Sequence, residues 1–127
     1  MNNKESSLKV SMFEQATVFL ERAGEFYPYG VFINKNGVAI PVGVYDDKDY
    51  LPSAEVITIL EDNLYRKIKN NESTLVGIGV DVKVNEVIEN NEVVKKDALM
   101  IKISKDGKNW KEEYYTYQIN NNIVIWR

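Results

Sequence analysis

Apolar residues recur at the spacing of an amphipathic helix in two segments of the chain. The first segment predicts a helix over residues 8–23, ended by Gly24, because glycine suits the left-handed end of a helix. The second predicts a helix that opens at Ser53 and stops around Asn70. The polar residues 1–7 are expected to be flexible. The positions expected to be buried are Phe13, Ala16, Leu20 and Ala23 in the first helix and Val56, Ile57, Leu60, Leu64 and Ile68 in the second.

Strands are predicted wherever branched apolar residues alternate with other residues between turn signals. The predicted strands are residues 31–33, 38–44, 75–84, 98–104, 110–119 and 123–126. Asn36-Gly37, Asn90-Asn91 and Asp106-Gly107 are expected to be turns, because Gly and Asn tolerate positive φ. Pro41 cannot donate a hydrogen bond to a neighbouring strand, so its strand is expected at a sheet edge or at a bulge.

The predicted elements follow the order αββα and then four strands in a meander. Short connections favour an antiparallel sheet, and we expect an α+β fold with both helices on one face of that sheet. The length of 127 residues and the hydrophobic fraction of 44% fit one domain over residues 1–127. No internal repeat or change of composition divides the chain.

The chain contains no histidine and no cysteine. This excludes Ser-His-Asp triads, cysteine nucleophiles and tetrahedral zinc sites built from these residues. Acid–base catalysis would have to use Asp, Glu, Lys or Tyr. Gly77-Ile78-Gly79 lacks the third glycine and the following helix of a dinucleotide-binding loop. The composition therefore favours a protein that is not an enzyme and uses no cofactor.

The balance of charge gives a net charge of -3, from 16 basic and 19 acidic residues. A broad nucleic-acid surface is usually marked by a basic excess, so we expect no nucleic-acid partner. The N-terminal residues lack the apolar core of a signal peptide, and no apolar run reaches the roughly 18 residues of a membrane span. We expect a cytoplasmic protein that does not bind a membrane.

The densest group of carboxylates in the sequence is formed by Asp46, Asp47 and Asp49. Carboxylate oxygens could hold Ca²⁺ or Mg²⁺, but the glycine and distant glutamate of an EF-hand loop are missing. Negative charge just before a helix also stabilises the N-terminus of that helix. We favour the second interpretation and predict no metal site.

A candidate ligand pocket is suggested by Asp81, which shares one strand face with Gly77 and Gly79. Two glycines in a strand can admit a ligand, and the carboxylate could then hold it. The alternative is that large side chains of a neighbouring strand cover the glycines.

Aromatic residues supply two candidate binding surfaces. Tyr27 and Tyr29 lie in a loop after the first helix, where they could recognise a partner or could close the core. In the strand over residues 110–119, the apolar Ile119 favours an inward face with Tyr115 and Tyr117. The outward face is then formed by Trp110, Tyr114, Thr116 and Gln118. This face is a candidate surface for a protein partner or a second copy of the chain.

The segment from Phe19 to Gly30 carries the sequence Gly-Glu-Phe-Tyr-Pro-Tyr after a helix, and a hairpin and the Pro52-Ser53 start of a second helix follow it. This arrangement resembles a group of small uncharacterised bacterial proteins with a similar helix, turn, hairpin and helix. The resemblance covers most of the chain and implies no catalytic residues. More distantly, the chain is similar to immunity proteins of contact-dependent toxin systems.

These observations favour a non-enzymatic protein-binding module, of which an immunity-type inhibitor of a bacterial toxin is one form. The alternatives are a structural homodimer and a small-ligand-binding protein or enzyme that uses Asp81 beside Gly77 and Gly79.

Overall fold

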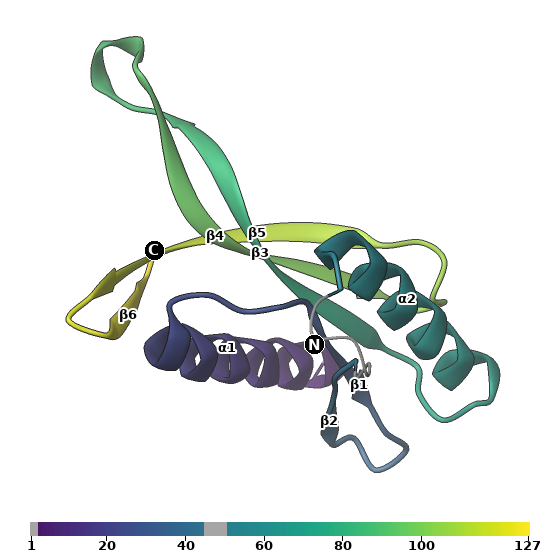
Figure 1. The fold of residues 1–127 in the computed structure, drawn as a ribbon. Helices are drawn as coiled ribbons and strands as arrows, with labels where there is room; N and C mark the ends of the chain where they lie inside the picture. The colour runs from purple at the N-terminus through teal and green to yellow at the C-terminus, as the bar shows by residue number, and fades with distance from the viewer. Residues whose placement is uncertain (1–2, 45–50) are drawn as a thin grey trace.

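The computed structural model describes residues 3–44 and 51–127, which form two helices and six strands (Figure 1). The helices are α1 (Asn3–Ala23) and α2 (Ser53–Lys69). The strands are β1 (Tyr29–Ile33), β2 (Ala39–Val42), β3 (Val76–Val87), β4 (Val93–Ser104), β5 (Lys111–Asn120) and β6 (Ile123–Trp126). A short 3-10 turn, η1 (Glu89–Asn91), joins β3 to β4. Every strand pair is antiparallel, so the predicted α+β class with an antiparallel sheet is confirmed.

The strands of the described residues form one sheet in the order β2-β1-β3-β4-β5-β6, and this sheet curls into a half-barrel (Figure 1). β2 is an edge strand, as predicted from Pro41. The missing N–H of a proline matters least at an edge, because no further strand needs it there.

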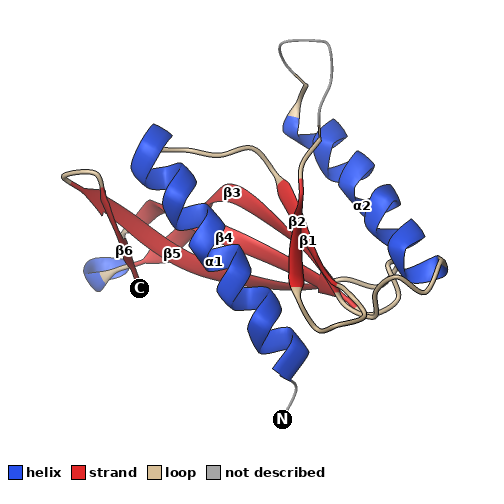
Figure 2. Ribbon diagram, turned by 90° about the horizontal axis from the view of Figure 1, so that it is seen from below, coloured by secondary structure: helices blue, strands red, loops and turns tan. Residues whose placement is uncertain are grey.

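The two helices lie on opposite faces of the sheet. Met12 of α1 lies against Gly77, whereas Leu60 of α2 lies against Gly30. Gly30 pairs with Ile78, the residue next to Gly77, and successive residues of a strand point to opposite faces. The prediction that both helices share one face is therefore wrong. Figure 2 shows α1 crossing in front of the sheet and α2 to the right, beyond β1 and β2.

The physical reason is that the first five residues of β3 and the residue before them are buried on both sides of the sheet. Every residue from 75 to 80 is buried, including Gly77 and Gly79. Alternation along a strand separates two faces, but it does not say that only one of them meets a helix. The glycines leave room for bulky side chains on the α1 face.

Each helix closes a separate core. The α1-side core is Leu8, Met12, Ala16, Tyr29, Val31, Ile33, Leu75, Leu99, Ile101 and Ile103. The α2-side core is Val56, Leu60, Leu64, Val76, Ile78 and Val80. The apolar face of α2 was predicted correctly, with Ile57 and Ile68 packed at its margin.

The buried face of α1 differs from the prediction. Helix α1 begins at Asn3 and not at residue 8 as predicted, so residues 3–7 are helical. Its buried residues, Leu8, Met12, Ala16 and Leu20, follow each other every fourth position. Phe13 lies beside this row and Ala23 is exposed. Neither α1 nor α2 is long and apolar enough to cross a membrane.

A long hairpin projects from the body of the protein (Figure 1). β3 and β4 stay paired from Val76 and Ser104 as far as Val87 and Val93. β5 accompanies β4 over only the half nearest the body. We call residues 83–97 the arm. The sequence predicted that β4 begins at residue 98, so the arm's second strand was missed.

Candidate functional site

The pocket predicted over Gly77 and Gly79 does not exist. Leu8 and Met12 lie against Gly77, and the ring of Tyr29 lies directly over Gly79. The space beside each glycine is filled by a core side chain, so the hypothesis of a ligand bound there is wrong. The alternative interpretation, that large side chains of a neighbouring strand cover the glycines, is correct for Gly79, which Tyr29 of β1 covers, whereas Gly77 is covered by side chains of α1.

Tyr29 is a core residue and not part of a recognition surface, which corrects one of the two predictions for the aromatic loop. It is buried, and its hydroxyl donates a hydrogen bond of 2.6 Å to the carbonyl oxygen of Met12. Burial raises the pKa of the Tyr29 hydroxyl well above its usual range. Its ring meets Phe19 and Phe26 edge-on, at centroid distances of 5.7 and 5.5 Å. The loop therefore closes the end of the α1-side core.

Asp81 faces a different hollow, of about 390 Å³, lined by residues 25–27, Ser53 and Asp81 itself. Its carboxylate accepts a hydrogen bond of 2.6 Å from the Tyr117 hydroxyl and another from the backbone N–H of Phe26. Burial raises the pKa of the Asp81 carboxyl, and these hydrogen bonds oppose that rise. Tyr27 is half-exposed at the rim of this hollow.

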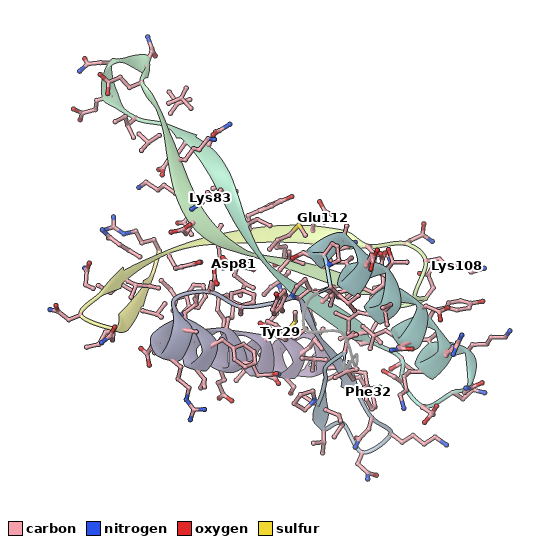
Figure 3. All side chains as sticks on the ribbon, viewed as in Figure 1. Tyr29, Phe32, Asp81, Lys83, Lys108 and Glu112 are labelled. Atoms are coloured by element: carbon pink, nitrogen blue, oxygen red, sulfur yellow. The ribbon has the colours of Figure 1, made fainter. Side chains whose placement is uncertain are left out.

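Figure 3 shows Tyr29 between α1 and the sheet, and Asp81 and Lys83 further along β3 towards the arm. The Asp81 carboxylate ties β3 to β5 and to the loop after α1, which is a structural use of the side chain. Asp81 therefore does not join the predicted glycines in one site.

The outward face predicted for β5 is divided between two places. Trp110 is half-buried against the α2-side core, and the Lys102 ammonium lies 5.3 Å from its ring centroid. Thr116 and Gln118 lie near the other end of β5. Tyr114, between them and Trp110, is 52% exposed. The predicted set therefore does not form one continuous surface.

Thr116 and Gln118 instead line a cleft where β4 and β5 separate. The last pair between these strands is Ala98 with Thr116. Beyond it, β4 continues into the arm with β3, and β5 continues with β6. The gap is a cleft of about 420 Å³, lined by residues 94–97 and 116–119 and by Arg127. We call it the fork cleft.

Both walls of the fork cleft are strand edges. Residues 93–97 of β4 pair with β3 on one side, and residues 117–120 of β5 pair with β6 on one side. Neither segment has a strand partner on its cleft side within the described part of the chain. Such an edge presents backbone N–H and C=O groups that can pair with another polypeptide.

Charged side chains at the fork cleft are mainly cationic, although the chain as a whole is acidic. Three cations, Lys95, Lys96 and Arg127, share the lining with one carboxylate, Asp97. Asp97 accepts a hydrogen bond of 2.6 Å from Lys83. These cations were not predicted from the sequence.

A sequence signal for the arm was present. Val87-Ile88 and Val93-Val94 flank the Asn90-Asn91 turn symmetrically, and both asparagines have positive φ. This symmetry indicates that both strands of the hairpin continue up to the turn.

Metal ligation has no support among the described residues, where no three acidic side chains come together as a metal site requires. The acidic group Asp46, Asp47 and Asp49 lies outside these residues. Comparison with protein-family models, curated proteins and solved structures gave no match to this chain. The candidate site therefore rests on its own geometry.

Proposed function

We propose that this chain is a non-enzymatic protein-binding module that engages its partner with the arm and the fork cleft. The observation that carries this proposal is the separation of β4 from β5, which leaves the arm outside both cores. A two-stranded hairpin is only marginally stable by itself in water. A partner that packs on the arm would bury the apolar side chains of the arm, which the body of the protein leaves exposed.

The tip of the arm carries apolar side chains that suit such a contact. Val87 and Val93, a directly opposed pair, are 66% and 63% exposed, and Ile88 beside them is also exposed. Grouped apolar residues on a projecting element are typical of protein interaction sites. Around them stand Glu86, Glu89 and Glu92, which give the tip a polar rim.

More specifically, we propose that the protein is an immunity-type inhibitor that acts in the cytoplasm. The arm projects from the body (Figure 1), as an element that enters a concave site must do. The absence of histidine and cysteine is compatible with inhibition by contact, which needs no catalytic group.

The test is capture of a partner from a native lysate of the source cells by two matched variants. Val87→Glu with Val93→Lys replaces the apolar pair by opposite charges, which attract each other across the strands and preserve the hairpin. Val38→Lys removes a valine that is 52% exposed in the β1–β2 turn. We expect the arm variant to lose the partner and Val38→Lys to keep it. Equal capture by both variants, or no partner even after crosslinking, would refute the proposal.

A second copy of the chain is the alternative partner, because the free edges at the fork cleft could pair across a two-fold axis. Sedimentation equilibrium over a wide concentration range distinguishes binding of a second copy from binding of a different protein. A dimer that dissociates in the arm variant supports self-association, and a monomer at all concentrations excludes it.

A further inference from the structure

The fork cleft indicates what kind of partner segment the protein would recognise. We propose that it binds an extended, acidic segment of a partner protein, which adds as a β-strand to the free edge of β4. This inference rests on the proposed function and specifies the chemistry of its partner.

The position of the added strand follows from the sheet. Between Ala98 and Ser104, the side of β4 away from β3 is occupied by β5. Over residues 93–97 the same side is vacant, since β5 has turned away to pair with β6. At about 3.4 Å per residue, this edge is about 17 Å long and accommodates about five residues of a guest strand. The cleft of about 420 Å³ has the size of an ordinary ligand site.

The cations at the cleft lie on both sides of such a strand. Lys95 and Lys96 are adjacent in β4, so their side chains leave opposite faces of the sheet. Arg127 belongs to the opposite wall, where its guanidinium donates a hydrogen bond of 2.9 Å to the Gln118 side chain. Acidic side chains on either face of a guest strand would therefore meet a cation.

The acidic partner is also favoured by how the cleft charges are paired. Asp97, the carboxylate of the lining, is already bound by Lys83 at 2.6 Å. Lys96 pairs with Glu86 at 3.0 Å, through side chains that are both accessible to solvent. The Lys95 side chain makes no ion pair or hydrogen bond within residues 3–44 and 51–127. At least one cation is therefore available to a ligand without breaking an existing contact.

A polypeptide fits the cleft better than another polyanion does. The free edge of β4 offers alternating N–H donors and C=O acceptors, which match the backbone of an extended peptide. A nucleic acid could meet the cations, but it has no backbone pattern that completes a strand ladder. Val94 and Ile119 add apolar contacts for the side chains between the acidic ones.

The experiment uses the whole protein and a fluorescent peptide of about ten residues that alternates glutamate with valine, the repeat of a strand. Fluorescence anisotropy measures its Kd. Two matched peptides accompany it: one with lysine in place of glutamate, and one that is N-methylated at alternate backbone positions, so that it keeps its charge but cannot form a ladder. We expect only the acidic, unmethylated peptide to bind, and each change to weaken binding by about tenfold or more.

Two protein variants carry the same change of charge. Lys95→Glu with Arg127→Glu reverses two cations of the fork cleft, and Lys35→Glu with Lys105→Glu reverses two exposed lysines elsewhere. We expect the cleft variant to weaken binding of the acidic peptide by about tenfold, and the control by less than about twofold.

Several outcomes would overturn the inference. They are no binding of the acidic peptide, equal binding of the methylated peptide, equal loss in both protein variants, and tighter binding of a single-stranded oligothymidylate than of the peptide. The capture experiment with the arm variant shows whether only the acidic-strand inference fails or whether the proposed protein-binding function fails as well. A partner that is lost only with the arm variant would leave the protein-binding function standing without the acidic strand.

Discussion

Tyr29 and Gly79 lie directly opposite each other in β1 and β3, and the phenol ring of Tyr29 occupies the space that a side chain at position 79 would need. A Cβ atom at Gly79 would lie 2.5 Å from Cζ of Tyr29, much closer than two non-bonded carbon atoms can approach. The ring cannot move aside easily, because its hydroxyl is bonded to the carbonyl oxygen of Met12 in α1. Gly79 and Tyr29 together join the sheet to α1.

Gly79→Ala is therefore expected to destabilise the protein. Forcing an extra methyl group into a filled core costs about 1–3 kcal/mol, and the fixed position of Tyr29 places this site at the upper end. Urea denaturation of the variant measures the change in the free energy of unfolding.

Gly30→Ala is the matched control for this variant. A Cβ atom at Gly30 would lie 3.3 Å from the side-chain ends of Leu60 and Leu64, which can shift. We expect a loss below about 1 kcal/mol. If Gly79→Ala is no more damaging than Gly30→Ala, the ring of Tyr29 does not fill the space beside Gly79.

Tyr117 and Tyr114 point to opposite faces of β5, as the alternation of the sequence predicted. Tyr117 is 6% exposed, whereas Tyr114 is 52% exposed. Tyr117→Ala should cost about 2–4 kcal/mol, because it opens a cavity and removes the hydroxyl donor of Asp81. Tyr114→Ala should cost less than about 1 kcal/mol. Chemical denaturation of both variants checks the orientation, and the reverse order of losses would contradict it.

Gly37 is the position in the β1–β2 turn that needs glycine, since its φ is +79°. The Asn34 side-chain oxygen accepts hydrogen bonds from the N–H groups of Asn36 and Val38, at 2.9 and 3.0 Å. Asn36 itself does not have positive φ. Gly37→Val should destabilise the protein by about 1–3 kcal/mol, because a branched residue is strained there. Gly37→Asn should cost less, since asparagine tolerates this region better. An unchanged melting temperature for Gly37→Val would argue against this turn.

Glu113 gives the stability of the protein a dependence on pH. The Lys9 ammonium lies 2.8 Å from its carboxylate and Lys111 lies 3.1 Å away, and the Tyr115 hydroxyl also donates to it. With Lys9 as the largest cause, these contacts lower the pKa of Glu113 from 4.5 to about 2. A carboxyl whose pKa is lower in the folded state stabilises that state above pH 4.5, and loses this effect as the pH falls towards 2.

Glu113→Gln is therefore expected to lower the free energy of unfolding at neutral pH. The lowered pKa corresponds to at most about 3 kcal/mol, and screening at a side chain that is 20% exposed reduces this to about 1–2 kcal/mol. Urea denaturation should show the difference from the wild type shrinking between pH 4.5 and pH 2. Glu112→Gln, on the exposed opposite face of β5, is the control, with an expected change within about 0.5 kcal/mol. A difference for Glu113→Gln that stays constant with pH would contradict the assignment.

Features that depend on a few neighbouring residues could be predicted from the sequence. Gly24, Gly37 and Gly107 have positive φ at the helix end and turns where glycine was expected. The alternation of β5 separated Tyr114 from Tyr117, and Pro41 correctly indicated an edge strand. These outcomes follow from the conformational range of single residues and from the two-residue period of a strand.

Of the candidate site, the sequence identified only Thr116 and Gln118, as residues of the outward face of β5. It did not identify the fork cleft, because the cleft exists where two strands stop pairing. Where a strand stops pairing is decided by contacts far apart in the chain, here by Trp126 of β6, which packs on Phe13 and donates a hydrogen bond to Thr17 of α1. No local preference in β4 or β5 encodes that separation.

The sequence by itself determined the class of the fold, its turns and the relative faces of its strands, because these depend on local sterics and periodicity. Only the tertiary structure decided which face each helix covers, what fills the space over Gly77 and Gly79, and where β4 leaves β5. A strand that is apolar on both sides, such as β3 near Ile78, gives no sign of which helix will lie on which face. That choice is made by the fit of Met12 and Tyr29 on one side and of Leu60 on the other, between elements distant in sequence.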